Sequence, residues 1–369
     1  MHSKAAQPYC PSGRRSPSLA GLLLLGTVAV GGCKHATPSP IGERKSPDTA
    51  NATASASALP APSASPVTSS AGSAAPPGDA GTAPDAPNKT PSAACSPRCY
   101  RWLLVETPKF PAPVDSLQER FPTPPGYQRV PVAPGSFAEW LRGLPLAAKD
   151  TPVVNNSGTT VFSAEDDYVA AVVSIDVGAG DLQQSADAVV RLNAEWLFAY
   201  NKQDAISYRS ATKLDMPFSR WAHGQRLIAS GPNVFWVVKG KPKEPTYDDF
   251  RQYIDSVMLW TNNVSLATRA THVSDPKDLT AGDFFLQSRG KGHALLVLDV
   301  AQKPTGERVA LLGQALQSPA QSFHVIRLGR ATAWFSMRPP NPVLTPRSDE
   351  FSWDDLSRLE PKAETKAAE

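Results

Sequence analysis

The chain has 369 residues, a formal net charge of +3 and 37 prolines. With so small a net charge and no basic stripe of interleaved aromatic side chains, nucleic acid is not an expected partner. The composition changes near residue 95: proline, alanine and serine dominate before it, whereas tryptophan, phenylalanine, valine and leucine become frequent after it. No cluster of metal-ligand residues is visible, so the sequence predicts neither a metal nor a cofactor.

The N-terminus has the pattern of an export signal. Arg14 and Arg15 precede an apolar run from Leu19 to Val30. That run is too short to span a bilayer as a helix, but it has the length of the hydrophobic part of a signal peptide. The sequence therefore predicts that the globular part works outside the cytoplasm.

The apolar run ends in Val-Gly-Gly-Cys, which resembles the lipobox of bacterial lipoproteins. The resemblance implies that residues 1–32 are a lipoprotein signal peptide and that Cys33 is acylated, so that membrane lipid is a partner. Lys34 follows, where an aspartate would commonly retain a lipoprotein at the inner membrane. The resemblance thus suggests an outer-membrane anchor, with the protein facing the periplasm or the cell surface. The alternative is an ordinary secretory signal in which the cysteine occurs by chance.

Residues 33–94 and 361–369 are predicted to be disordered. The longer segment consists mostly of Pro, Ala, Ser, Thr and Gly, which cannot bury enough apolar area to offset the entropy of ordering. It would be a tether between the lipid and the globular domain of residues 95–360. At the start of that domain, Cys95 and Cys99 are predicted to form a local disulfide, with free thiols as the alternative.

The globular part has the pattern of an α+β fold. One long helix precedes several antiparallel strands, which favours a single large α+β domain over a doubly wound sheet. The predicted helices cover residues 136–146, 181–200 and 246–267, and the predicted strands cover 168–178, 234–240, 282–287, 293–300, 308–314 and 322–328. Ser136 and Asp181 are the expected N-caps of the first two helices. The strands at 293–300 and 308–314 are expected to form a hairpin.

Several blocks resemble an uncharacterised bacterial family, domain of unknown function 4846. They are PPGYQRV, SFAEWLRGLPL, DLQQSADAVVRL, AGDFFLQ, GHALLVLDV and SPAQSFHVI, and they run in family order from about Phe121 to Leu359. The family name implies no activity, so the chemistry has to come from the residues.

Two of these blocks also resemble papain-like cell-wall hydrolases of the NlpC/P60 and CHAP type. In those enzymes a cysteine begins a helix, a Gly-Asp turn leads into a later strand, and a Gly-His pair begins the next one. AGDFFLQ and GKGHALLVLDV follow that arrangement at Asp283 and His293. This resemblance implies a papain-like helix followed by an antiparallel sheet. It also implies that Ser185 occupies the position of the cysteine.

The candidate catalytic residues are Ser185, His293 and Gln314. A hydroxyl is far less acidic than a thiol, so Ser185 would need His293 as a general base rather than the helix terminus alone. Gln314, expected opposite His293 in the hairpin, would orient the imidazole. Gln183 and Gln184 are candidate oxyanion donors, and Asp283 is expected at the cleft. In the alternative reading, His293 caps a strand and Ser185 is an ordinary helix residue.

The sequence therefore predicts a peptidase or amidase that acts on cell-envelope peptides such as peptidoglycan stem peptides. The alternative is a catalytically inactive binding or scaffolding module that kept the cleft and lost the thiol.

Overall fold

The computed structural model describes residues 99–287, 292–348 and 350–360. The predicted signal peptide, Cys33, the tether, Cys95 and the C-terminal tail lie outside these residues. Cys99 is disulfide-bonded. Among the described residues, no helix combines the length and the apolar character needed to cross a bilayer.

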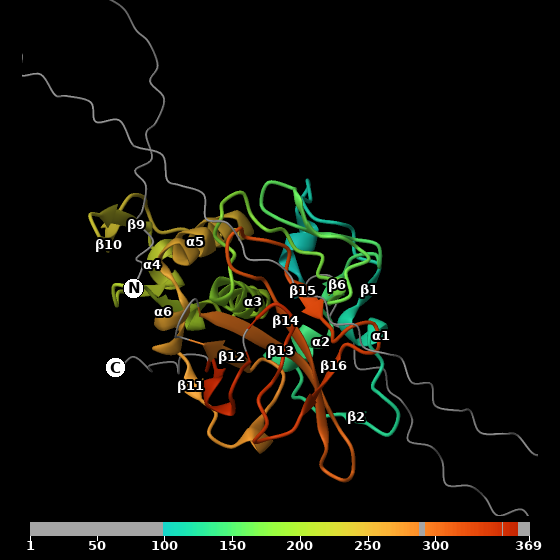
Figure 1. Ribbon diagram of the computed structural model, residues 1–369. Helices are drawn as coiled ribbons and strands as arrows, with labels where there is room; N and C mark the ends of the chain where they lie inside the picture. Colours follow the sequence, from blue (N-terminus) through green and yellow to red (C-terminus); the bar gives the residue numbers. More distant parts are fainter. Residues whose placement is uncertain (1–98, 288–291, 349, 361–369) are drawn as a thin grey trace, which may run out of the picture. The chain divides into compact units, whose positions relative to one another are not determined.

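A nine-stranded sheet forms the centre of the domain (Figure 1). Its order is β11-β17-β12-β13-β14-β15-β6, with β16 added to β14 and β2 added to β13, and all pairings are antiparallel. Its strands are β2 (Gln128–Arg129), β6 (Val169–Val172), β11 (Thr271–His272), β12 (Phe284–Gln287), β13 (His293–Gln302), β14 (Arg308–Gln314), β15 (His324–Ile326), β16 (Trp334–Met337) and β17 (Leu356–Arg358).

Helices pack on one face of this sheet. They are α1 (Leu117–Arg120), α2 (Phe137–Arg142), α3 (Ala186–Ala199), α4 (Phe218–Ala222), α5 (Tyr247–Trp260) and α6 (Asn263–Ala267). Four two-stranded sheets lie outside the central one: β1 (Asp115–Ser116) with β3 (Pro145–Leu146), β4 (Val153–Val154) with β5 (Thr160–Phe162), β7 (Ser207–Arg209) with β8 (Asp215–Pro217), and β9 (Gln225–Ser230) with β10 (Asn233–Val238). The α+β prediction is confirmed: helices and a mainly antiparallel sheet form one mixed domain.

Strand β13 is buried on both faces, which explains its unbroken apolar sequence. Ala294, Leu296 and Leu298 belong to the core shared with the helices. Leu295 and Val297 belong to a second core that the C-terminal segment completes. Because side chains alternate along a strand, His293 lies on the same face as Leu295.

Helix α3 is the central helix of the domain. Every residue from Ala186 to Phe198 is buried, and the helix contacts both β13 and α5 (Figure 1). The prediction of a helix starting at Asp181 was wrong by five residues. Asp181 instead accepts the Gln184 side-chain amide and the Ala320 amide, which holds residues 181–184 in a turn before the helix begins.

Other element boundaries also differ from the predictions. Ser136 caps α2 as predicted, accepting the Glu139 amide at 3.2 Å. The helix predicted at 246–267 is interrupted after Trp260, where Asn262 caps the separate α6. The strand predicted at 168–178 is only β6, because the chain leaves the sheet after Val172 and enters the turn that leads to α3.

Candidate functional site

Ser185 stands at the N-cap position of α3 in a strained conformation. Its φ is 47° and its ψ is −108°, a region that residues with a Cβ rarely adopt. Such strain costs about 1–3 kcal/mol and persists only where neighbouring contacts enforce it. Here the Ser185 amide donates to the Ala315 carbonyl at 3.0 Å. As a result the hydroxyl does not cap its own helix but turns toward the start of β13.

The structure brings Ser185, His293 and Gln314 together in one hydrogen-bonded series. Ser185 Oγ lies 3.2 Å from His293 Nδ1, and His293 Nε2 lies 2.8 Å from Gln314 Oε1. Because a Gln carbonyl oxygen can only accept, Nε2 carries the ring proton and Nδ1 presents its lone pair to the hydroxyl. Oγ also accepts the Ala294 amide at 2.9 Å. The hydroxyl proton is thus directed at the imidazole.

The surroundings of His293 keep the imidazole neutral at neutral pH. Burial lowers the pKa of His293, and the hydrogen bond from its ring to Gln314 opposes that effect without cancelling it. Only 6 % of His293 is exposed, and Phe351 packs against the ring with the centroids 5.9 Å apart. A neutral imidazole with a lone pair facing a hydroxyl is the state that a general base requires.

Gln314 reaches His293 diagonally and not from the directly opposite position that was predicted. The β13–β14 register pairs Leu296 with Gly313, which continues to Leu295 opposite Gln314. The hairpin turn closes between Lys303 and Glu307, and a bulge follows at Leu298. Long side chains at diagonal positions of an antiparallel pair are within reach of each other, so the contact forms despite the shifted register.

Gln183 and Gln184, the two predicted oxyanion donors, differ in their contacts. Gln183 is buried and its Oε1 accepts Arg191 Nη1 at 3.0 Å, while its Nε2 has no partner among the described residues. Gln184 is engaged elsewhere, because its Nε2 donates to Asp181 Oδ1 at 2.8 Å. Its predicted role as an oxyanion donor therefore has no support in this geometry.

Asp283 does not contribute to the Ser185 site. Its buried carboxylate accepts Arg358 Nη2 at 2.9 Å and the Thr280 amide at 2.9 Å, and it closes the turn before β12. Burial raises the pKa of Asp283, and the hydrogen bond from Arg358 opposes the rise. A fully buried carboxylate needs such partners. The antiparallel pairing of β12 with β17 brings Arg358 next to Asp283.

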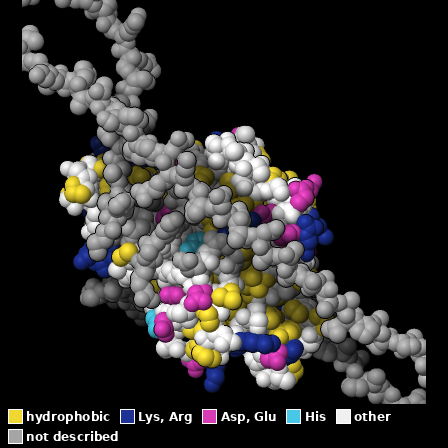
Figure 2. All heavy atoms as spheres, viewed as in Figure 1, with side chains coloured by type: hydrophobic (Ala, Val, Ile, Leu, Met, Phe, Trp, Pro, Cys, Tyr) yellow, Lys and Arg dark blue, Asp and Glu magenta, His cyan; other side chains and the backbone are white. Residues whose placement is uncertain are grey.

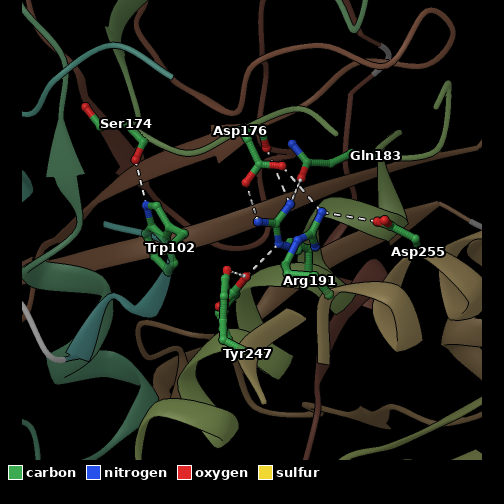
Figure 3. Close-up of polar contacts among 9 residues, drawn as sticks. Trp102, Ser174, Asp176, Gln183, Arg191, Tyr247 and Asp255 are labelled. Carbon is green, nitrogen blue, oxygen red and sulfur yellow. Dashed lines mark hydrogen bonds and ion pairs between the residues drawn. The ribbon is translucent and has the colours of Figure 1, made fainter. Parts of the chain in front are cut away.

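A buried ion network around Arg191, which the sequence did not indicate, contacts Gln183 in the turn before α3 (Figure 3). Arg191 of α3 donates to Asp176 Oδ2 at 2.9 Å and to Glu195 Oε1 at 2.9 Å. Burial would raise the pKa of Asp176, but Arg191 and Arg251 outweigh it and hold that pKa well below its usual range. An Arg and a Glu four residues apart in a mainly apolar helix were the signal that could have indicated this pair.

This network fixes the side-chain amide of Gln183. Figure 3 shows the Arg191 guanidinium lying between Asp176 and Gln183. Because the guanidinium can only donate, it selects the carbonyl end of the amide and leaves the nitrogen end as an unused buried donor. Buried polar atoms without partners are rare, and a catalytic role is one of their recognised causes.

Two cavities lie away from Ser185 and His293. One, of about 690 Å³, is lined by Asp176, Tyr247 and Arg251 among others, so that it adjoins the ion network. The other, of about 290 Å³, is lined by Arg308 and Trp353 among others. Ser185, which is 4 % exposed, lines neither cavity. Within the described ranges, no group of three or more His, Cys, Asp or Glu side chains could hold a metal ion.

The fold and the site define an α+β domain in which a strained helix terminus presents a serine to a buried histidine. A family model described as "Domain of unknown function (4846)" matches residues 117–358. The chain therefore belongs to this family. No curated protein and no solved structure matches it.

Proposed function

We propose that the protein is a hydrolase, a peptidase or amidase, with Ser185 as nucleophile, His293 as general base and Gln314 as the residue that orients the imidazole. The observation that carries the proposal is the hydrogen-bonded series from the Ala294 amide through Ser185 and His293 to Gln314. It combines a nucleophile, a neutral base and an orienting group within hydrogen-bond reach, which is the arrangement of covalent acyl transfer.

In the proposed reaction, Ser185 Oγ attacks the carbonyl carbon of an amide while His293 Nδ1 takes the hydroxyl proton. The imidazolium that forms is stabilised by Gln314 Oε1, which accepts the Nε2 proton at 2.8 Å. Collapse of the tetrahedral intermediate breaks the C–N bond, and His293 gives its proton to the leaving amine. Water, deprotonated in turn by His293, then hydrolyses the acyl-enzyme.

Two groups are suited to stabilise the oxyanion. The first is Gln183 Nε2, the buried donor whose orientation Arg191 sets. The second is the Ala186 amide at the first position of α3, for which no acceptor is found among the described residues. Helix N-terminal amides carry partial positive charge, and the amide after a nucleophile is a recurrent oxyanion donor.

The proposed setting of this reaction is the cell envelope. The lipobox-like sequence supports Cys33 as an acylated anchor in the outer membrane, and residues 33–94 would form the tether. The accessible substrates would then be envelope peptides, such as the stem peptides of peptidoglycan. The arrangement would be papain-like, with serine in place of cysteine.

A second candidate function is a binding or scaffolding module without turnover. It is favoured by the burial of Ser185 and His293 and by the absence of either residue from the two cavities described above. In that case the Ser185–His293 hydrogen bond would be a structural contact at the start of β13.

Labelling of the full-length protein with a fluorophosphonate probe distinguishes the two functions. The hydrolase proposal expects the probe to bind covalently to Ser185, located by peptide mass spectrometry. Labelling should be lost in Ser185→Ala and fall at least tenfold in His293→Ala, while Ser256→Ala on the exposed side of α5 should label normally. A folded protein that leaves Ser185 unlabelled would favour the binding module.

A further inference from the structure

The hairpin of β9 and β10 stands apart from the central sheet. Its two strands pair only with each other among the described residues, and Figure 1 shows them at the edge of the domain, beyond α4 and α5. One side of the hairpin packs on the domain through Leu227 and Trp236. The other side has no cover in the described structure.

Large apolar side chains are exposed on this hairpin. Ile228 and Phe235 are cross-strand partners, so their side chains lie next to each other on the outer side, 39 % and 48 % exposed. Val238, at the end of β10, is 76 % exposed but lies on the same side of the strand as Trp236, so it is not part of this outer pair. Figure 2, viewed from the same side, shows hydrophobic side chains on the surface at the place of this hairpin. An exposed aromatic side chain beside an exposed aliphatic one gives the outer side of the hairpin an apolar surface that can take part in binding.

The same segment is strongly cationic. Residues 220–243 contain no Asp or Glu and five cations: Arg220, Arg226, Lys239, Lys241 and Lys243. Lys243 pairs with Asp249. No ion pair is found for the other four among the described residues. Two of them, Arg220 and Arg226, stack on Trp236 and Trp221, which holds their guanidinium groups on the hairpin.

We propose that this hairpin docks on the surface of an anionic lipid membrane. Apolar side chains flanked by cations are what the headgroup and acyl-chain boundary of such a membrane accepts, since the aromatic and aliphatic groups enter the boundary while the cations meet the lipid phosphates. A nucleic acid would match the cations but would leave Ile228 and Phe235 in water. The proposal does not depend on the hydrolase function or on the acylation of Cys33.

Docking would act as a second contact with the membrane. A cation near an anionic membrane surface contributes about 1 kcal/mol to binding. Lys239 and Lys241 should therefore each strengthen the membrane-binding constant about fivefold. Binding should weaken as salt rises, because the screening length falls to about 3 Å at 1 M.

The test places an environment-sensitive fluorophore at the hairpin tip of the full-length protein, by Ser230→Cys in a Cys10→Ser, Cys33→Ser background. Vesicles of 30 % phosphatidylglycerol in phosphatidylcholine should shift the emission to the blue, and nitroxide-labelled lipids should quench it. Ile228→Ser with Phe235→Ser, or Lys239→Glu with Lys241→Glu, should reduce the shift at least tenfold at a fixed lipid concentration. A matched label at Leu344→Cys, also an exposed apolar position, should not respond.

Each other outcome overturns the proposal. Unchanged emission at residue 230 would mean that the hairpin does not meet lipid, however the rest of the chain associates. An equal shift on pure phosphatidylcholine would remove the role of the cations. Lipid-free sedimentation that shows a dimer abolished by Phe235→Ser would assign the surface to a second copy of the chain.

Discussion

Replacement of Gln314 tests whether this residue orients and stabilises the imidazole of His293. In Gln314→Leu, His293 Nε2 loses an acceptor at 2.8 Å, in a site where His293 is 6 % and Gln314 2 % exposed. Leaving a buried donor without a partner costs about 1–3 kcal/mol, and leucine has a similar size, so the free energy of unfolding should fall by about 2 kcal/mol. The pKa of His293 should fall further, because the hydrogen bond that raises it is gone.

Gln314→Glu should move the pKa of His293 in the opposite direction. A carboxylate beside the ring favours the imidazolium, so the pKa of His293 should be higher in Gln314→Glu than in Gln314→Leu. Urea unfolding measures the stability, and an NMR titration of the histidine ring measures the pKa. Gln321→Leu is the matched control, because Gln321 is equally buried and its Oε1 already lacks a partner in the described structure. Equal urea midpoints for Gln314→Leu and wild type, with an unchanged His293 pKa, would mean that Gln314 neither orients nor stabilises the imidazole.

Three further outcomes are expected. Asp299→Asn should lower stability by about 3 kcal/mol in urea unfolding, because the fully buried carboxylate pairs with Arg129 at 2.6 Å and Arg142 at 2.7 Å; a loss below about 1 kcal/mol would contradict this. Burial lowers the pKa of His324 to about 4, so the stability due to the neutral ring is complete above about pH 6.5 and is lost as the pH falls toward 4. This loss, at most about 3 kcal/mol, should disappear in His324→Asn. The contrary result would be that the free energy of unfolding depends on pH in His324→Asn as it does in the wild type. Finally, cells grown on labelled palmitate should label the wild type and not Cys33→Ala, whereas equal label on both would exclude acylation at Cys33.

The parts of the fold that depend on local pattern could be predicted from the sequence. The hairpin of β13 and β14 follows from two apolar runs around a turn-rich link, and β14 has the predicted bounds. The helix α3 was predicted from its apolar spacing, but its start was predicted five residues too early, because Asp181 accepts the amide of Ala320, a residue distant in the sequence. Such long-range hydrogen bonds leave no local signal.

The site could be predicted in part for a similar reason. The resemblance to papain-like hydrolases and the expected hairpin pointed to Ser185, His293 and Gln314. The structure brings these three side chains within hydrogen-bonding distance, and their catalytic role stays a prediction. The partner of Asp283 was missed because Arg358 comes from the last strand, 75 residues further on. The ion network of Arg191 was missed because Asp176 and Arg251 approach α3 only in the folded domain.

The alkylation rate of Ser185→Cys by iodoacetamide, measured as a function of pH, tests most directly whether Ser185 occupies an activated nucleophile position. A helix N-terminus and a nearby imidazole together stabilise a thiolate. The apparent pKa of the thiol at residue 185 should therefore lie clearly below about 8.5. His293→Ala in the same chain should raise that pKa. The chain with Ser185 intact gives the background from the other cysteines. An apparent pKa at or above about 8.5 with and without His293, or no reaction of the folded protein, would mean that Ser185 does not occupy an activated nucleophile position.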